Sequence, residues 1–145
     1  MSNDRLSNLI VIQKALSKND TGETGGHQAG ILIPKKQELL SFFPFLSQDE
    51  KNPRVRLVFI DPFDSAWHFT YIYYNNKFFG GTRNEYRLTG MSRYMKENHI
   101  VAPDTLILKK NIGGSYFIEF TKESEGLTTS SGVLILSDSW SVVKI

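Results

Sequence analysis

The side chains of residues 82–87, Thr-Arg-Asn-Glu-Tyr-Arg, match the hydrogen-bonding groups on the edges of DNA base pairs. If this segment forms a strand, alternate side chains point the same way, so Arg83, Glu85 and Arg87 share one face. Arginine can bond guanine O6 and N7 together, a carboxylate can accept from cytosine N4, and asparagine pairs with adenine. The segment therefore predicts a base-reading element. A solvated, charged hairpin edge would contain the same residue types, so the spacing leaves both interpretations open.

A glycine-rich segment at 17–28 is a second candidate for contact with a nucleic acid. Gly22, Gly25 and Gly26 allow positive φ angles and let backbone amides approach a phosphate closely. The segment is not a P-loop, which needs Gly-Lys-Ser/Thr before a helix, because Gly26 is followed by His27 and then by a predicted strand. His27 could donate to a phosphate or to a guanine, or it could be a structural histidine in an ordinary glycine-rich connection.

Candidates for catalysis are weak throughout the chain. A restriction-type nuclease site needs acidic side chains and a lysine around Mg²⁺, and Asp49-Glu50-Lys51 has this spacing only within a polar turn before Pro53. There is no Gly-x-Ser-x-Gly elbow, and the absence of cysteine excludes thiol nucleophiles and thiolate metal sites. The three histidines are far apart in the sequence. We therefore expect neither a catalytic site nor a metal or cofactor site in this chain.

The composition is that of one globular domain spanning residues 1–145. Hydrophobic residues make up 40% of the chain and charged residues 22%, which is typical of a chain with a single core. The net charge is only +2, but seven Lys/Arg and three acidic residues lie between Lys77 and Lys110, so the positive charge is local. The apolar runs are too short to cross a membrane and the N-terminus lacks a signal-peptide pattern, so we expect a soluble, cytoplasmic protein without membrane contact.

Short β-branched and aromatic runs, separated by turns rich in Gly, Asn and Ser, predict a mainly β chain. The predicted strands are 9–16, 30–33, 55–60, 67–74, 105–108, 116–120, 133–136 and 140–143. Two segments predict short helices: 35–43, entered through Pro34, and 91–98, with Tyr94 as its core anchor. Many short strands with two short helices favour a small barrel or sandwich, because closure removes exposed sheet edges.

Two blocks of the sequence resemble the N-terminal effector-binding domain of EcoRII-type restriction endonucleases. The first block runs from Leu16 to Gln28 and is followed by Ile33-Pro34, and the second holds Ile72-Tyr73-Tyr74-Asn75, Phe79-Gly80 and then Thr82 to Arg87. The layout is also similar to that of the plant B-three transcription-factor domain, with Ile-Pro-Lys before a helix that ends at Phe43-Pro44. The resemblance covers about residues 10–120, which is most of the chain.

The resemblance implies a seven-stranded DNA-binding pseudobarrel that grips duplex DNA with two arms in the major groove. The first arm would hold Lys18, Asn19, Thr24 and His27, and the second arm Thr82, Arg83, Asn84, Glu85 and Arg87. In this arrangement the two arginines would read guanines, Glu85 a cytosine, and Asn84 an adenine or a phosphate. Lys18, Lys77 and Arg93 would hold the DNA backbone, which sets position rather than sequence.

EcoRII-type enzymes recognise CCWGG, where W is A or T, and the resemblance makes this site the first candidate target. The sequence departs from the family's pattern at three positions, because the family has basic residues in place of Gly81 and Tyr86 and a tyrosine in place of Leu32. Tyr86 could instead pack on a sugar. The family's nuclease domain, with its Mg²⁺, is absent, so the resemblance implies a recognition domain that binds DNA without cutting it. Its partners would be duplex DNA and the catalytic domain of the parent enzyme.

Two other function classes stay open. A stand-alone B-three-like transcription regulator would use the same fold and the same arms. A small β-barrel could instead bind a sugar or another protein through Trp67, Tyr71, Tyr73 and Tyr74, although alternating aromatics in a strand more often pack in a barrel wall. Salt dependence separates these classes, because phosphate contacts release counterions and sugar contacts do not.

Overall fold

The computed structural model describes residues 9–25, 30–123, 133–135 and 139–143. In this part of the chain, nine strands and four short helices follow one another. In chain order they are β1 (Ile10–Ala15), α2 (Lys18–Thr21), β2 (Ile31–Ile33), α3 (Gln37–Leu40), β3 (Arg54–Ile60), β4 (Ala66–Tyr74), η1 (Asn76–Phe79), β5 (Glu85–Thr89), α4 (Ser92–Glu97), β6 (Thr105–Lys110), β7 (Tyr116–Thr121), β8 (Val133–Ile135) and β9 (Trp140–Val143). None of the described helices has the length and apolar character needed to span a membrane.

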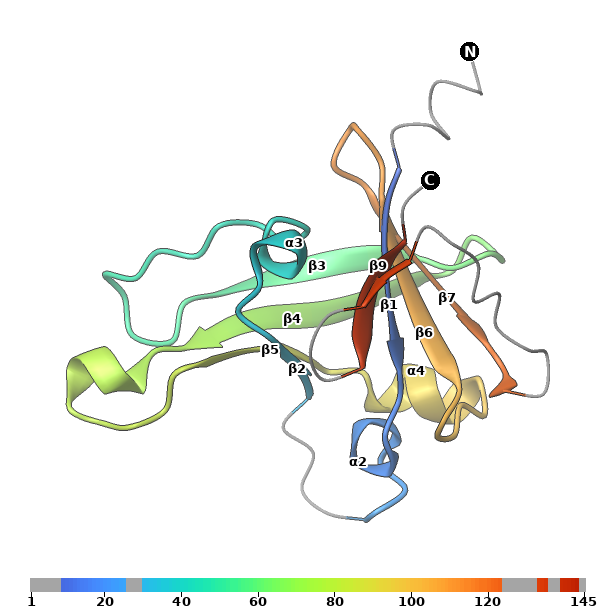
Figure 1. Cartoon of the computed structure of the whole chain (residues 1–145), viewed down its shortest axis with the longest axis horizontal. Coiled ribbons are helices and arrows are strands. Elements are labelled where there is room, and N and C mark those ends of the chain that lie inside the picture. Colours follow the sequence, from blue (N-terminus) through green and yellow to red (C-terminus); the bar gives the residue numbers. More distant parts are fainter. Residues whose placement is uncertain (1–8, 26–29, 124–132, 136–138, 144–145) are drawn as a thin grey trace.

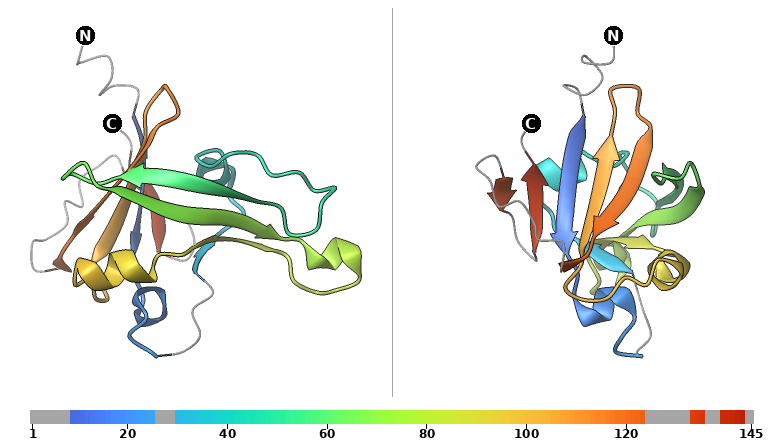
Figure 2. Two further views of the ribbon diagram at one scale, coloured as in Figure 1. Left: turned by 180° about the vertical axis from the view of Figure 1, so that it is seen from behind. Right: turned by 90° about the vertical axis from the view of Figure 1, so that its right-hand side faces the viewer.

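The strands form one curled sheet in the order β2-β5-β4-β3-β7-β6-β1-β9-β8. Neighbouring strands are antiparallel except β3 and β7, which pair in parallel. The ribbon of β3, β4 and β5 runs almost across the direction of β1, β6, β7 and β9 (Figure 1), and the view from behind shows the same crossing (Figure 2). The sheet therefore wraps around its core as an open half-barrel, which confirms the mainly β pseudobarrel expected from the sequence.

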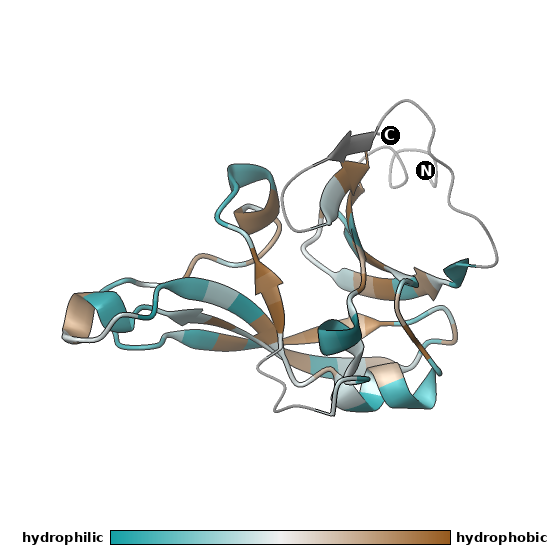
Figure 3. Ribbon diagram, turned by 60° about the horizontal axis from the view of Figure 1, so that its bottom comes forward, coloured by the Kyte–Doolittle hydropathy of each residue, from teal (hydrophilic) through white to brown (hydrophobic). Residues whose placement is uncertain are grey.

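The core is built from strand residues that alternate between the two faces of the sheet. Along β4, Phe69, Tyr71 and Tyr73 point inward and are at most 3% exposed. On the neighbouring strand β3, Leu57 and Phe59 are buried on the same face. Figure 3 shows hydrophobic segments gathered where the ribbon meets the other strands and the helices, whereas the far part of the ribbon is largely hydrophilic. The ribbon is thus anchored in the core at one end, and its far end faces solvent.

The two predicted helices are confirmed in shorter form. Helix α3 keeps only the middle of the predicted segment, and the chain after it turns so that Phe43 is buried at 4% exposure. Helix α4 presents Tyr94 to the core, where the ring is 1% exposed and meets Trp67 edge-on at 5.0 Å. Tyr94 is therefore the anchor that the sequence predicted.

The resemblance implied seven strands and the residue pattern predicted eight, but the described residues contain nine. Each of the eight segments predicted as strands forms one, and the additional strand is β5. Strand β5 begins at Glu85 and lies between β2 and β4, with backbone ladders on both sides. These ladders hold residues in an extended conformation that their charged and polar side chains signal only weakly. The expected pair of helices was also too few, since α2 and η1 are present as single turns.

Candidate nucleic-acid interface

Two segments project from the sheet where the sequence predicted the arms (Figure 1). The first arm, residues 17–25, follows β1 and contains α2. The second arm, residues 75–84, joins β4 to β5 at the far end of the ribbon and contains η1. Of the predicted contacts, His27 lies outside the described residues, so its role stays a prediction.

Hydrogen bonds hold the second arm to the rest of the fold. Asn75 is fully buried at its base, where its side-chain amide donates to the carbonyl of Glu50 (2.6 Å) and its Oδ1 accepts from the N–H of Asn52 (2.7 Å). Across the arm, the N–H of Lys77 donates to the carbonyl of Arg83 (2.9 Å). These bonds give the arm a defined backbone shape and leave the side chain of Lys77 exposed at its tip.

Arg83, Glu85 and Arg87 form a charged cluster, which confirms that they share one face. The Glu85 carboxylate accepts from Arg87 Nε and from Arg83 Nη2, the latter at 3.3 Å. Arg87 also donates through Nη1 to the carbonyl of Gly30 (2.9 Å), and the Arg83 guanidinium lies 3.6 Å from the ring centre of Tyr74. The side chains of Arg83, Glu85 and Arg87 are 38%, 28% and 20% exposed, so they are held in place but remain accessible.

The strand does not extend over the whole segment that the sequence singled out. Because β5 begins at Glu85, the residues Thr82, Arg83 and Asn84 lie in irregular backbone. Arg83 reaches the face of Glu85 through the ion pair and its ring contact rather than through strand alternation. Thr82 is exposed at the same edge of the arm.

The ionisation of Glu85 follows from its two arginine neighbours. Burial alone would raise the pKa of this carboxyl, but the hydrogen bond from Arg87 and the charges of Arg87 and Arg83 outweigh that effect and hold the pKa below its ordinary value. A carboxylate has about four lone-pair sites and a guanidinium several N–H donors, so each group can bond its neighbour and an outside partner. The cluster therefore presents donors around one acceptor. Guanine acceptors and a cytosine amino group complement this pattern.

Asn84 and Tyr86 turn to the face opposite the cluster. The hydroxyl of Tyr73 donates to Asn84 Oδ1 (2.7 Å) and holds the side chain on that face, while the second lone pair of Oδ1 can still accept from another donor. The ring of Tyr86 stacks on that of Tyr73, with 4.1 Å between centres and 5° between planes. The ring of Tyr86 is thus part of a stack on the face opposite the arginines, and because it is only partly buried, its contact with a sugar stays a prediction.

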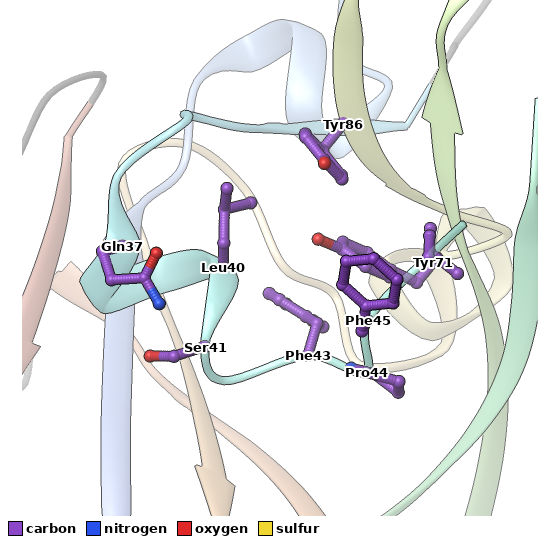
Figure 4. Close-up of a pocket in the computed structure, with 9 residues that line it drawn as sticks. Gln37, Leu40, Ser41, Phe43, Pro44, Phe45, Tyr71 and Tyr86 are labelled. Carbon is purple, nitrogen blue, oxygen red and sulfur yellow. The ribbon is translucent and has the colours of Figure 1, made fainter. Parts of the chain in front are cut away.

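A stack of aromatic rings supports β5 from behind. Tyr86 also stacks with Tyr71 at 5.8 Å, and Tyr71 stacks on Phe43 at 4.4 Å. The rings of Tyr86, Tyr71 and Phe43, with Phe45, line a groove beside α3 (Figure 4). Tyr71 and Tyr73 are only 1% and 3% exposed, so they cannot serve as the sugar- or protein-binding surface considered from the sequence.

The first arm begins with a helical turn that the sequence analysis missed. Ser17 Oγ accepts from the N–H of Asp20 (3.1 Å), and Asp20 Oδ2 accepts from the N–H of Ser17 (2.9 Å), which is a capping box. Asp20 also forms a buried ion pair with Lys14 of β1, with 2.5 Å between Nζ and Oδ2. This anchoring places Lys18 and Asn19 on an exposed helical turn rather than in a glycine-rich loop.

The part of the first arm after α2 is attached to the segment between α4 and β6. The Glu23 carboxylate accepts from Thr21 Oγ1 (2.5 Å) and from the N–H of Ala102 (2.7 Å), and these two bonds hold the pKa of Glu23 below its ordinary value. Thr24 is exposed, with its hydroxyl 3.5 Å from Asn19 Oδ1. The structure thus brings the predicted contact residues Asn19 and Thr24 together.

Arg93 lies apart from the charged cluster. It is on α4, where its Nε is 2.5 Å from Glu97 Oε2 and its guanidinium lies 5.2 Å from the ring centre of Trp67. Trp67 is near the start of β4, whereas the cluster lies beside the end of that strand. Helix α4 itself contacts α2 of the first arm.

Sequence analysis missed two arginines on the face of the cluster and considered Tyr74 there only for binding a sugar or a protein. Tyr74 is opposite Glu85 in the β4–β5 ladder and stacks with Arg83. Arg54 and Arg56 alternate along β3 and are exposed. The alternation of Arg54 and Arg56 with hydrophobic residues was visible in the sequence, but the pairing of β3 with β4 was not.

Comparison with known proteins identifies the family. The family model described as "Restriction endonuclease EcoRII, N-terminal" matches residues 6–105. The chain belongs to this family. Type II restriction enzyme EcoRII of Escherichia coli is 44% identical over 85 residues, which are 57% of this chain and 21% of that enzyme.

Members of the B3 group are also similar to this EcoRII N-terminal chain. A B3 domain-containing protein of Arabidopsis thaliana is 29% identical over 125 residues, which are 83% of this chain and 47% of that protein. The matches thus cover less than half the length of both curated relatives. The structure of the Arabidopsis FUS3-DNA complex has a TM-score of 0.57 at 19% identity and covers 76% of this chain and 94% of that chain. This likeness confirms the B3-type fold.

The structure shows the surroundings of Gly81 and Leu32, two positions at which the sequence departs from the EcoRII pattern. A Cβ atom on Gly81 would lie 2.9 Å from the Cβ of Asn76 and 3.2 Å from its carbonyl oxygen, which already accepts from the Gly81 N–H at 2.8 Å. A basic side chain there would need a different turn. Leu32 is partly buried opposite Arg87 in the β2–β5 ladder, so an apolar side chain stands beside Arg87 where the pattern has tyrosine.

Proposed function

We propose that this chain binds double-stranded DNA sequence-specifically, as the effector or recognition domain of a type II restriction endonuclease in a restriction-modification system. The observation that carries the proposal is the cluster of Arg83, Glu85 and Arg87, which holds complementary groups on one accessible face where the second arm joins β5. The proposal is supported by membership of the EcoRII N-terminal family and by a fold similar to that of a protein solved in complex with DNA.

In this proposal both arms enter the major groove. Arg83 and Arg87 read guanines, and Glu85 accepts from cytosine N4. The ring of Tyr74 and the carboxylate of Glu85 orient the guanidinium groups before DNA arrives, so less side-chain freedom is lost on binding. The first arm contributes Asn19 and Thr24, which are exposed and adjacent.

Three cations contact the phosphate backbone in the same proposal. Lys18 is exposed on the first arm, Lys77 on the tip of the second arm, and Arg93 on α4 beside the first arm. Contacts to phosphates fix the register of the protein on the duplex but carry no sequence information. Their loss should therefore weaken binding to all sequences alike.

We propose CCWGG, with W being A or T, as the target. Its G·C pairs offer the guanine acceptors and cytosine amino groups that the cluster complements. The cluster residues Arg83, Glu85 and Arg87 lie within the part of the chain that matches the EcoRII family model, and the EcoRII enzyme is 44% identical over the aligned region.

We further propose that the chain does not cut DNA by itself. Its match to EcoRII covers 21% of that enzyme, and its sequence lacks a convincing nuclease pattern. The catalytic domain of the parent enzyme, with its Mg²⁺, would be its partner. The cytoplasmic location expected from the sequence suits a restriction enzyme and stays a prediction.

A stand-alone transcription regulator is the second candidate function. It is favoured by the similarity to a B3 domain-containing plant protein over 83% of this chain. A regulator would use the same arms and the same cluster, and it would differ in the domain and the genes that accompany it. The presence or absence of a nuclease region in the full gene separates the two candidates.

A fluorescence-anisotropy titration tests the proposal. The chain is titrated against a CCWGG duplex and a scrambled duplex of the same composition, at about 50 and 200 mM salt. We expect a preference for CCWGG of roughly a hundredfold or more that persists at the higher salt. Equal, salt-sensitive binding to both duplexes would contradict the target, and no binding to either would contradict DNA recognition as a whole.

A further inference from the structure

Strand β3 carries two exposed arginines, Arg54 and Arg56, which alternate along the strand and so point to one face of the sheet. In the sheet register, Arg54 lies opposite Ile72 of β4, and Ile72 lies opposite Arg87 of β5. Neighbouring strands are about 4.8 Å apart, so Arg54 is roughly two strand spacings from Arg87 on the same face. The row of arginines therefore continues from the second arm onto β3.

The charge on this face is strongly positive. Four arginines lie on it: Arg54 and Arg56 of β3, Arg87 of β5 and Arg83 at the end of the second arm. The acidic side chain among them is Glu85, which already bonds Arg83 and Arg87. Among the described residues, no ion pair within 4.0 Å includes Arg54 or Arg56. Arg54 Nε donates to the carbonyl of Asn52 at 3.3 Å, which holds the stem of the side chain near the strand.

The face is also poor in exposed hydrophobic surface. Ile72, which lies between Arg54 and Arg87, is only 1% exposed, since long arginine stems on either side can cover it. Thr70, the next residue of β4 on this face, is polar and partly buried. The exposed large hydrophobic residue here is Val58, at 43%, toward the C-terminal end of β3 and away from the second arm. A charged partner suits this surface better than an apolar protein face.

We propose that Arg54 and Arg56 bind phosphates of the DNA backbone that flanks the base pairs contacted by the arms. This inference rests on the proposed DNA recognition and extends its footprint onto β3. Alternate residues of a strand are about 7 Å apart, comparable to successive phosphates along one DNA strand. A guanidinium group matches a phosphate with two parallel hydrogen bonds. The two arginines thus contribute affinity and orientation without reading bases.

The test compares the wild-type chain with the double variant R54A/R56A on two CCWGG duplexes and their scrambled counterparts. The short duplex ends one base pair beyond the candidate site, and the long duplex extends about ten base pairs, one helical turn, on either side. Anisotropy titrations are run from about 50 to 200 mM salt. On the long duplexes, the double variant should bind cognate and scrambled DNA more weakly by on the order of tenfold. The slope of log affinity against log salt should fall by about 2, since each phosphate contact contributes about 0.9.

Two control variants distinguish a phosphate contact from a loss of structure or of general charge. R54K/R56K keeps both charges and should recover most of the salt slope. K109A/K110A removes two positive charges from β6, in the other half of the sheet, and should leave the slope unchanged. On the short duplex, R54A/R56A should bind like the wild type. Circular dichroism of each variant verifies that the fold is retained.

Three results would overturn the inference. If R54A/R56A matched the wild type in affinity and slope on the long duplex, the face of β3 would not touch DNA, although the proposed function would stand. If the double variant lost its preference for CCWGG over scrambled DNA, the arginines would read bases or shape the arm rather than hold the backbone. If the wild-type chain bound no DNA at all, the proposed function and this inference would fail together.

Discussion

The variant Glu85→Gln keeps the size of the side chain and removes its charge, so it isolates the electrostatic role of Glu85 in the charged cluster. The carboxylate accepts from Arg87 and Arg83 and is 28% exposed. The glutamine oxygen can still accept from Arg87. Its amide N–H groups would then face the DNA, where they meet the donor on cytosine N4 instead of accepting from it.

The size of the expected effect follows from these contacts. A good base contact is worth about 1–3 kcal/mol of discrimination, so the preference for CCWGG should fall by roughly 5- to 150-fold. Removing a carboxylate makes the face more positive, so binding to scrambled DNA should strengthen at low salt. The free energy of unfolding should fall by only about 1 kcal/mol, because all three side chains are partly exposed and water screens their ion pairs.

Anisotropy titrations of both proteins against CCWGG and scrambled duplexes measure the change in preference. The matched control is Glu97→Gln, which removes the same charge from the pair with Arg93 on α4 and should leave the preference unchanged. Because the arginines hold the pKa of Glu85 below its ordinary 4.5, the carboxylate stays ionised from about pH 5 to pH 8 and should add no pH dependence to the preference in that range. A Glu85→Gln variant with wild-type preference would refute base reading by Glu85 and leave it a purely structural role.

Three further predictions concern the second arm and the stability of the fold. Arg83→Ala should cost about 1–3 kcal/mol of specific binding and relax the base preference at one position, whereas Lys77→Ala should weaken binding to cognate and scrambled DNA alike. Anisotropy titrations measure both affinities, and a loss for Arg83→Ala that is equal on cognate and scrambled DNA would contradict its role. Trp140→Phe removes the hydrogen bond from Nε1 to the carbonyl of Leu32 (3.0 Å) and should lower the free energy of unfolding by about 1–3 kcal/mol. Urea denaturation measures this change, and an unchanged midpoint would show that this link between β9 and β2 contributes little. For Asp104, burial alone would raise the pKa, but the hydrogen bonds that the carboxylate accepts hold the pKa below the ordinary 3.8. The ionised carboxylate therefore stabilises the fold above about pH 3.8, and this stabilisation is lost as the pH falls through the lowered pKa. Asp104→Asn should be less stable than the wild type near pH 6, and the difference should shrink on acidification.

Much of the β architecture could be predicted because the signals are local. Alternating aromatic and β-branched residues mark segments such as Trp67 to Tyr74 as strands, since side-chain direction follows from the backbone of the strand itself. The same rule placed Glu85 and Arg87 on one face. The number of strands was underestimated because the extended conformation of β5 depends on its two neighbouring strands.

The parts of the site that could not be predicted depend on contacts between distant segments. The position of Arg87 needs the carbonyl of Gly30, which lies beside it only when β2 and β5 are paired. The helical turn at the first arm is different, because Ser17 and Asp20 of its capping box are close in the sequence, and this local signal was missed. The stack that holds the ring of Tyr86 also depends on contacts between distant segments, because it includes residues of β4 and of the segment after α3.

The sequence by itself determined the mainly β character of this chain, the family to which it belongs and the residue types available for recognition, because these depend on local patterns and on the order of motifs. The tertiary structure decided which of those residues act together. It joined Arg83, Glu85 and Arg87 through ion pairs, withdrew Tyr71, Tyr73 and Tyr86 into a stack, and placed Arg54 and Arg56 beside the cluster. The physical reason is that strand register and curvature, which arise from packing around one core, set the distances between side chains that are far apart in the sequence.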